Sequence, residues 1–150
     1  MLFVRHATTP GMPAGCFPAD EDANAASLTR AAASGSVEAP VAWAAPGRAA
    51  RQTAAAMGLA APEIPALAEA DCGRWRGLPY GRVALEEPDA PASRLADPHA
   101  APHGGESLSA LAARVAGRLD AVRGEPRAVV VCDGLPVRLA PPAAICDALR

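Results

Sequence analysis

Arg5 and His6 follow a short apolar run, Leu2-Phe3-Val4, near the start of the chain. A neutral imidazole can attack phosphorus, and a neighbouring guanidinium can bind two phosphate oxygens through its planar fork while keeping its charge. The pair therefore suits phosphoryl transfer. An Arg-His dipeptide is weak evidence alone, because a histidine at a strand end is more often structural or solvated, so the rest of the chain must decide.

The elements that would position this pair alternate between strands and helices. Short continuous apolar runs, typical of parallel strands covered on both faces, occupy 2–5, 41–45 and 128–132. Helical periodicity covers 27–33, 48–58 and 107–123. The alternation predicts an α/β fold, and 150 residues fit one domain, 1–150. In such sheets ligands gather at the carboxyl ends of the strands, where Arg5-His6, the turn before Arg48 and Asp133-Gly134 are expected.

Several further segments carry motifs. They are Leu28-Thr29, Ala45-Pro46-Gly47-Arg48-Ala49-Ala50-Arg51-Gln52-Thr53-Ala54, Glu69-Ala70-Asp71-Cys72-Gly73-Arg74-Trp75-Arg76-Gly77 and Gly105-Glu106-Ser107. Together with Arg5-His6-Ala7 they resemble the histidine phosphatase superfamily, which contains the cofactor-dependent phosphoglycerate mutases and the α-ribazole phosphatases. The resemblance covers most of the chain. It implies a three-layer α/β sandwich with a mainly parallel central sheet, phosphoglycerate mutase-like and shortened at its C-terminal end.

The resemblance also implies roles for individual residues. His6 would become phosphorylated, Arg5 would bind the phosphoryl group, and Glu69 would donate a proton to the leaving oxygen. A carboxylic acid beside an apolar tryptophan keeps its proton nearer to neutral pH, which suits a general acid. The alternative is that Glu69 and Asp71 are solvated loop carboxylates.

A second phosphate-binding arginine is expected at the start of a helix, where backbone N–H groups and the helix dipole favour an anion. Arg48 is the expected equivalent, although Arg51 shares its helical face and remains an alternative. Gly105-Glu106-Ser107 is interpreted mainly as a helix start, with Ser107 as the N-cap and Glu106 at the positive end of the dipole.

The main departure from the family pattern is Asp133, where the family has a second histidine that helps to hold the phosphoryl group. At about 4 Å and an effective dielectric constant near 20, each pair of like unit charges costs about 4 kcal/mol, so an ionised Asp133 would oppose a phosphate. Three arrangements are open. Asp133 could carry a proton, it could pair with Arg138 or Arg5, or it could hydrogen-bond to His6 and stabilise the imidazolium, which would silence the nucleophile.

Two proline-containing stretches, 10–18 and 86–102, are predicted to be loops. The segment 10–26 is expected to fold over the phosphate. Because 86–102 is short, the cleft is expected to be open, which favours a phosphatase over a mutase. If Asp133 must be protonated, activity should be weak near pH 7 and rise on mild acidification until His6 itself protonates.

Composition limits the partners. The 14 basic and 16 acidic side chains are interspersed and give a net charge of -2, so nucleic acid is not expected as a partner. No apolar run reaches membrane-spanning length, and the run before Arg5 is too short for a signal peptide, so a cytoplasmic protein without membrane contact is expected. The sequence leaves a homodimer open.

No metal or organic cofactor is expected. Cys16, Cys72, Cys132 and Cys146 form no C-x-x-C pair, and Pro102 lies between His99 and His103 in a loop, which is unsuited to metal ligation.

Two functional hypotheses remain. The first is a phosphomonoesterase that acts through a phosphohistidine on a small phosphorylated metabolite and releases inorganic phosphate. The alternative is a catalytically impaired family member that binds a phosphorylated ligand or a protein partner without turnover.

Overall fold

The computed structural model describes residues 1–34, 39–122 and 127–134. Its centre is a three-stranded parallel sheet in the order β1-β3-β2. The strands are β1 (Leu2–Arg5), β2 (Val41–Ala44) and β3 (Ala128–Cys132). All five residues of β3 are buried, as the continuous apolar run 128–132 predicted for a central strand.

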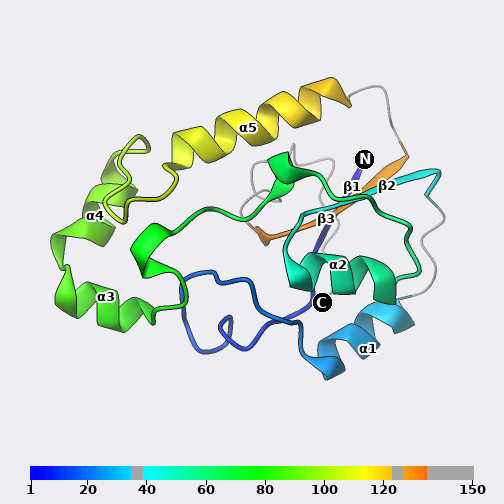
Figure 1. Cartoon of the computed structure of the whole chain (residues 1–150), viewed down its shortest axis with the longest axis horizontal. Coiled ribbons are helices and arrows are strands. Elements are labelled where there is room, and N and C mark those ends of the chain that lie inside the picture. Colours follow the sequence, from blue (N-terminus) through cyan, green and yellow to red (C-terminus); the bar gives the residue numbers. More distant parts are fainter. Residues whose placement is uncertain (35–38, 123–126, 135–150) are drawn as a thin grey trace.

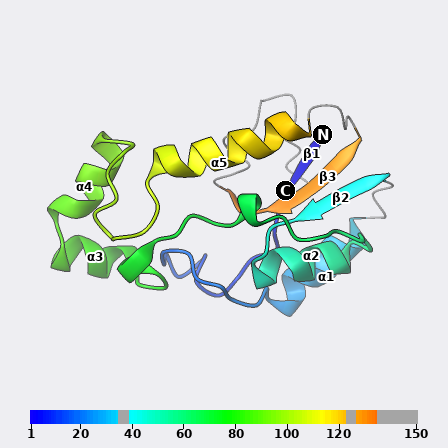
Figure 2. The same cartoon turned by 45° about the horizontal axis from the view of Figure 1, so that its top comes forward.

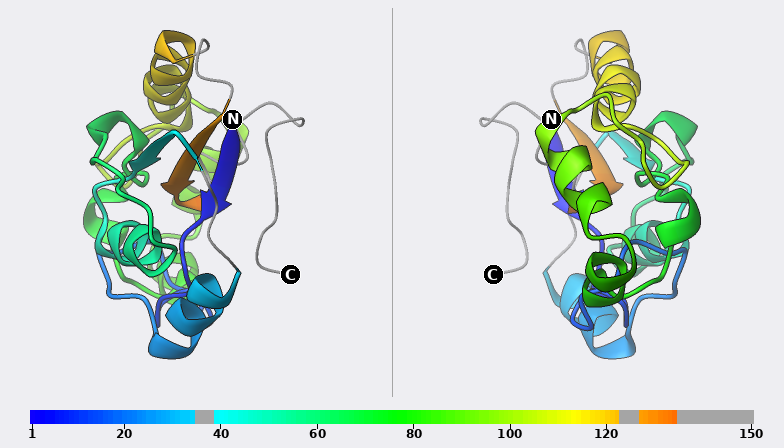
Figure 3. Two further views of the ribbon diagram at one scale, coloured as in Figure 1. Left: turned by 90° about the vertical axis from the view of Figure 1, so that its right-hand side faces the viewer. Right: turned by 90° about the vertical axis from the view of Figure 1, so that its left-hand side faces the viewer.

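Helices cover both faces of this sheet, which confirms the predicted three-layer α/β architecture (Figures 1 and 2). The helices α1 (Ala25–Ala33) and α2 (Arg48–Ala56) lie together on one side, and α5 (Leu108–Ala121) lies on the other. Figure 3, which views the molecule from its two ends, shows the same arrangement. The Ser107 side chain accepts a hydrogen bond from the backbone N–H of Ala110 at 3.1 Å, as expected for the N-cap of α5.

Two short helices lie at one end of the molecule, away from the sheet: α3 (Tyr80–Glu86) and α4 (Asp89–Ala96) (Figure 1). The prediction of a loop over 86–102 is therefore wrong for Asp89–Ala96. None of the α4 residues is buried, so the helix needs no apolar face. Its sequence therefore lacks the apolar periodicity from which a helix could have been predicted. Pro91 is only the third residue of α4, where a backbone N–H has no intrahelical partner and its loss does no harm.

The largest core cluster joins the sheet to α2. Val129, Val130 and Val131 of β3 pack in this cluster with Phe3 of β1 and with Ala50 and Ala54 of α2. The small side chains of α2 allow this helix to approach the sheet closely. Single-turn helices η1 (Pro65–Leu67) and η2 (Gly73–Trp75) lie along the segment that connects α2 to α3.

Membrane insertion is not indicated for the helices that the structure describes, since each is too short or too polar to cross a bilayer. The predicted continuation of the fold after Asp133, including Arg138 and Cys146, lies outside the described residues.

A pair of leucine variants tests this assignment of core and surface. Leu111 of α5 is 1% exposed, whereas Leu85 of α3 is 86% exposed. We expect Leu111→Ala to lower the free energy of unfolding by about 2–5 kcal/mol, because it removes buried apolar surface and leaves a cavity. Leu85→Ala should change it by less than about 0.5 kcal/mol. Urea denaturation measures both, and equal losses would contradict the assignment.

Candidate active site

A cleft of about 710 Å³ opens at the carboxyl ends of the strands. The side chains that the sequence predicted for the site all line it: Arg5, His6, Arg48, Glu69 and Asp133. Residues of the segment 10–26, including Phe17 and Asp20, also line the cleft, so this segment borders the site.

The backbone of β1 and β3 places His6 beside Asp133. The register pairs Arg5 with Cys132, and the His6 N–H donates to the Cys132 carbonyl at 2.9 Å. The next residue is held from α2, because the Ala7 N–H donates to the hydroxyl of the buried Thr53 at 2.8 Å. His6 and Asp133 therefore leave neighbouring strands at the same edge, and both are buried.

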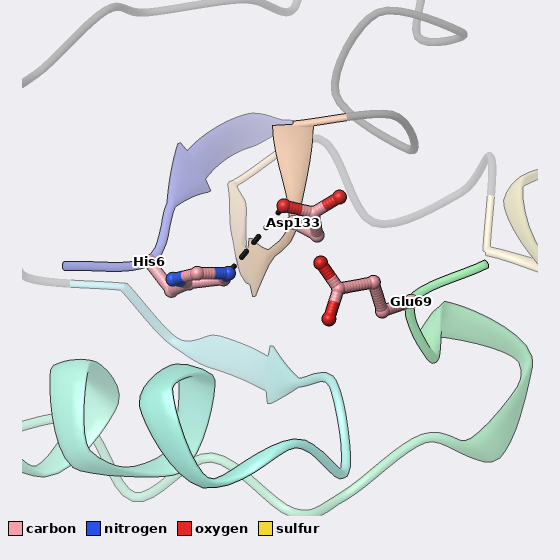
Figure 4. A group of neighbouring side chains, drawn as sticks. All are labelled: His6, Glu69 and Asp133. Carbon is pink, nitrogen blue, oxygen red and sulfur yellow. Dashed lines mark ion pairs between the residues drawn. The ribbon is translucent and has the colours of Figure 1, made fainter. Parts of the chain in front are cut away.

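The hydrogen bonding of His6 determines which ring nitrogen is free to react. Nδ1 lies 2.8 Å from the Ala7 carbonyl, and a carbonyl only accepts, so Nδ1 carries the proton. In the neutral ring the lone pair is then on Nε2. This atom lies 3.4 Å from Oδ1 of Asp133 (Figure 4). Of the three arrangements that the sequence left open for Asp133, the structure thus has the one in which its carboxylate contacts His6.

The surroundings of His6 favour its imidazolium form. Burial opposes protonation, but the hydrogen bonds to Asp133 and Ala7 and the negative charges of Asp133 and Glu69 outweigh it, so the pKa of His6 is raised above its usual 6.5. Protonation places a hydrogen on Nε2 and removes its lone pair. Asp133 therefore stabilises the form of His6 that cannot attack phosphorus.

Glu69 enters the same space from the chain between η1 and η2 (Figure 4). Its pKa is raised to about 8, first by burial and then by the negative charge of Asp133, so it carries its proton at pH 7. The sequence attributed this retention of a proton to the neighbouring tryptophan. In the structure the largest cause at Glu69 is burial, followed by the charge of Asp133, and the Trp75 indole N–H donates to Glu87 at 3.0 Å.

The Gly105-Glu106-Ser107 motif contributes to the position of Glu69. The guanidinium of Arg114 binds both carboxylate oxygens of Glu106, at 2.7 and 2.8 Å, and donates to the Glu69 carbonyl at 3.2 Å. A Cβ atom at Gly105 would lie 2.2 Å from the Asp71 carbonyl oxygen, so only glycine fits there. For Glu106 the sequence predicted only a role at the helix dipole, and its bond to Arg114 was not predicted.

The two candidate arginines of α2 have different surroundings. Arg48 is the first residue of α2 and lines the cleft, whereas Arg51 is not among the described lining residues and pairs with Glu63 at 3.6 Å. The structure therefore favours Arg48 at the site. Its guanidinium lies 3.3 Å from the Asp22 carboxylate, and its backbone N–H donates to Asp20 at 2.7 Å. Sequence reasoning did not predict these acidic partners.

The cleft is also lined by residues that the sequence motifs did not indicate. Phe17 and Tyr80 line it and pack edge to face with ring centroids 4.6 Å apart. Arg94 of α4 also lines it, and its guanidinium lies 2.6 Å from Nε2 of the buried His103. His103 itself is absent from the described lining of the cleft.

Comparisons with known proteins give the family. A family model of the histidine phosphatase superfamily (branch 1) matches residues 1–145. No match was found among curated proteins.

Solved structures share the fold. A mycobacterial glucosyl-3-phosphoglycerate phosphatase in complex with VO3 is 26% identical, with a TM-score of 0.77, over 91% of this chain and 77% of that one. The complex of the mycobacterial phosphatase with inorganic phosphate is 25% identical, with a TM-score of 0.74, over 91% and 74%. The protein TTHB049 from Thermus thermophilus is 27% identical, with a TM-score of 0.78, over 91% and 79%. On the family match and this shared fold, the chain belongs to the histidine phosphatase superfamily.

Proposed function

We propose that the protein hydrolyses phosphate monoesters of small metabolites through a phosphohistidine at His6. The observation that carries the proposal is the geometry of His6: Nδ1 donates to the Ala7 carbonyl, so the neutral ring has its lone pair on Nε2, in a cleft that is also lined by Arg5, Arg48 and Glu69. The similarity to a mycobacterial phosphatase in complex with inorganic phosphate supports a phosphorylated ligand for this cleft.

In the proposed first step Nε2 attacks phosphorus, and the N–P bond forms as the bond from phosphorus to the ester oxygen breaks. Glu69 gives its proton to the leaving oxygen, for which its raised pKa of about 8 suits it. In the second step water attacks the phosphohistidine, Glu69 takes a proton from the water, and inorganic phosphate leaves. Arg5 and Arg48 neutralise the phosphoryl charge throughout.

Asp133 limits this reaction in two ways. Its charge opposes the phosphate, and its contact with Nε2 at 3.4 Å holds His6 in the imidazolium form. We therefore propose a slow phosphatase. The same contact favours the second candidate, a family member that binds a phosphorylated ligand without turnover.

Hydrolysis of an aryl phosphate by purified variants separates the two candidates. We expect the parent protein to be slow and His6→Ala to be inactive, because it lacks the nucleophile. Asp133→His should be faster than the parent by at least about tenfold, since it removes a repulsion larger than about 1.4 kcal/mol. The exposed His99 lies outside the described lining of the cleft, so His99→Ala serves as the control and should match the parent.

Activity in Asp133→His alone would favour the binding candidate. Activity that survives in His6→Ala would contradict a phosphohistidine mechanism.

The pH dependence of the parent follows from the two shifted groups. Turnover needs His6 neutral and Glu69 protonated, so activity should fall on acidification below the raised pKa of His6 and on alkalinisation above about pH 8. This direction is opposite to the rise on mild acidification that the sequence suggested. Measurement of kcat/KM against pH, with a chelator present, checks it. Activity that increases as the pH falls below 6.5 would contradict it.

The ion pair between Arg48 and Asp22 leads to a further prediction. Asp22→Asn should tighten the binding of inorganic phosphate by up to about fivefold, because an exposed ion pair contributes at most about 1 kcal/mol. Calorimetry of phosphate binding measures the change. Glu86→Gln is the matched control, since it removes one negative charge and frees Arg82, which is not among the described residues that line the cleft. An equal effect of both variants would exclude a specific competition for Arg48.

A further inference from the structure

The three side chains in Figure 4 present one nitrogen and two carboxylate groups to a common point. One ring nitrogen of His6 and one carboxylate oxygen each from Glu69 and Asp133 all lie within 4.8 Å of one another, and Nε2 is the ring nitrogen that contacts Asp133. In the part of the chain that the structure describes, no other group of histidine, cysteine and acidic side chains has this geometry. We propose that this triad binds a divalent transition-metal ion, with Zn²⁺ as the reference ion.

The distances suit one ion of this class. Zn²⁺ binds imidazole nitrogen and carboxylate oxygen at about 2.0–2.2 Å, so two ligands of one tetrahedral ion lie at most about 3.6 Å apart. The pair formed by His6 Nε2 and Asp133 Oδ1, at 3.4 Å, already falls within this limit. The widest separation, within 4.8 Å, exceeds this limit by up to about 1.2 Å, so binding of an ion requires the carboxylate side chains to rotate inwards.

The hydrogen bond of the other ring nitrogen is the one that a metal-binding histidine makes. Metal-ligating histidines almost always donate their second N–H to a carboxylate or to a backbone carbonyl, which fixes the ring and its tautomer. His6 donates Nδ1–H to the Ala7 carbonyl at 2.8 Å. Nε2 therefore faces Asp133 before any ion binds, and in the neutral ring this atom carries the lone pair.

The charge of Asp133 attracts a cation to this point. Because Glu69 carries its proton and His6 favours imidazolium, an ion that binds all three groups would displace the protons of Glu69 and of His6 Nε2. The nearby Arg5 lies close enough to act on Glu69 electrostatically, and its charge opposes an added cation. A divalent ion that touches both carboxylates and the imidazole outweighs this more distant charge, because electrostatic energy falls with distance.

The ligand set selects the class of ion. Imidazole suits Zn²⁺ and other late first-row transition metals, whereas carboxylate oxygens also suit Mn²⁺, and affinity generally rises from Mn²⁺ to Cu²⁺. Mg²⁺ prefers oxygen ligands and retains its waters, so it should bind poorly. The sequence predicted no metal site because it considered only His99, His103 and the cysteines, whereas these three ligands come from segments far apart in the chain.

Metal binding has a direct consequence for the chemistry. The ion would occupy the Nε2 lone pair, which is the pair that must attack phosphorus in the proposed phosphatase. A metal-loaded protein could then form no N–P bond, so the ion would act as a reversible inhibitor. The binding itself does not depend on the phosphatase proposal.

The test uses the full-length protein, freed of metal with a chelator and then titrated with Co²⁺ in the absence of substrate. Visible absorption follows the geometry around the bound ion, and competition with Zn²⁺ gives its affinity. We expect one equivalent to bind with nitrogen and oxygen ligands. The near-isosteric Asp133→Asn and the His6→Ala variant should each lose at least about tenfold in affinity. Circular dichroism verifies that both remain folded.

Cys16→Ser and His99→Ala are the controls, because Cys16 lines the same cleft and His99 is an exposed histidine elsewhere. Both should bind the ion as tightly as the parent. Thiolate charge-transfer absorption, loss of binding in either control, unchanged affinity in folded Asp133→Asn, or no saturable binding would each overturn the proposal. A protein that binds the ion but never hydrolyses a phosphate ester would contradict the proposed function alone.

Discussion

The contact between His6 and Asp133 governs the chemistry of this site, and it follows from the pairing of β1 with β3. The register that pairs Arg5 with Cys132 brings the next residue of each strand to the same edge. Both side chains are buried there, so their charges act on each other with little screening. The resulting ion pair favours imidazolium at His6 and helps to keep the proton on Glu69, so Asp133 acts on the protonation of both groups.

Glu69 joins this pair only because a separate set of contacts holds its backbone. Arg114 of α5 bridges the Glu106 carboxylate to the carbonyls of Ala66, Ala68 and Glu69. The backbone of Gly105 also lies close to the carbonyl of Asp71, which helps to hold the chain that follows Glu69. Helix α5, on the face of the sheet opposite α1 and α2, therefore positions the proposed acid Glu69. The sheet itself positions the proposed nucleophile His6.

Sequence reasoning predicted what depends on local patterns. Continuous apolar runs indicated the three strands, and the motifs indicated His6, Glu69 and Arg48. It missed α4, because a wholly exposed helix has no apolar face to show in the sequence. It also missed the pairing of Arg48 with Asp20 and Asp22 and the convergence of three metal-ligating groups, since these contacts join segments whose distance only the folded chain determines.

The central claim is that Asp133 sets the protonation state of His6, and nitrogen NMR of the His6 ring in chelator-treated protein tests it most directly. Titration of the parent and of Asp133→Asn would give the pKa of His6 in each. The account predicts a value above 6.5 in the parent, a clear fall in the variant as burial becomes the dominant influence, and the neutral-ring proton on Nδ1 in the parent. An unchanged pKa in Asp133→Asn, or a parent value at or below 6.5, would contradict it.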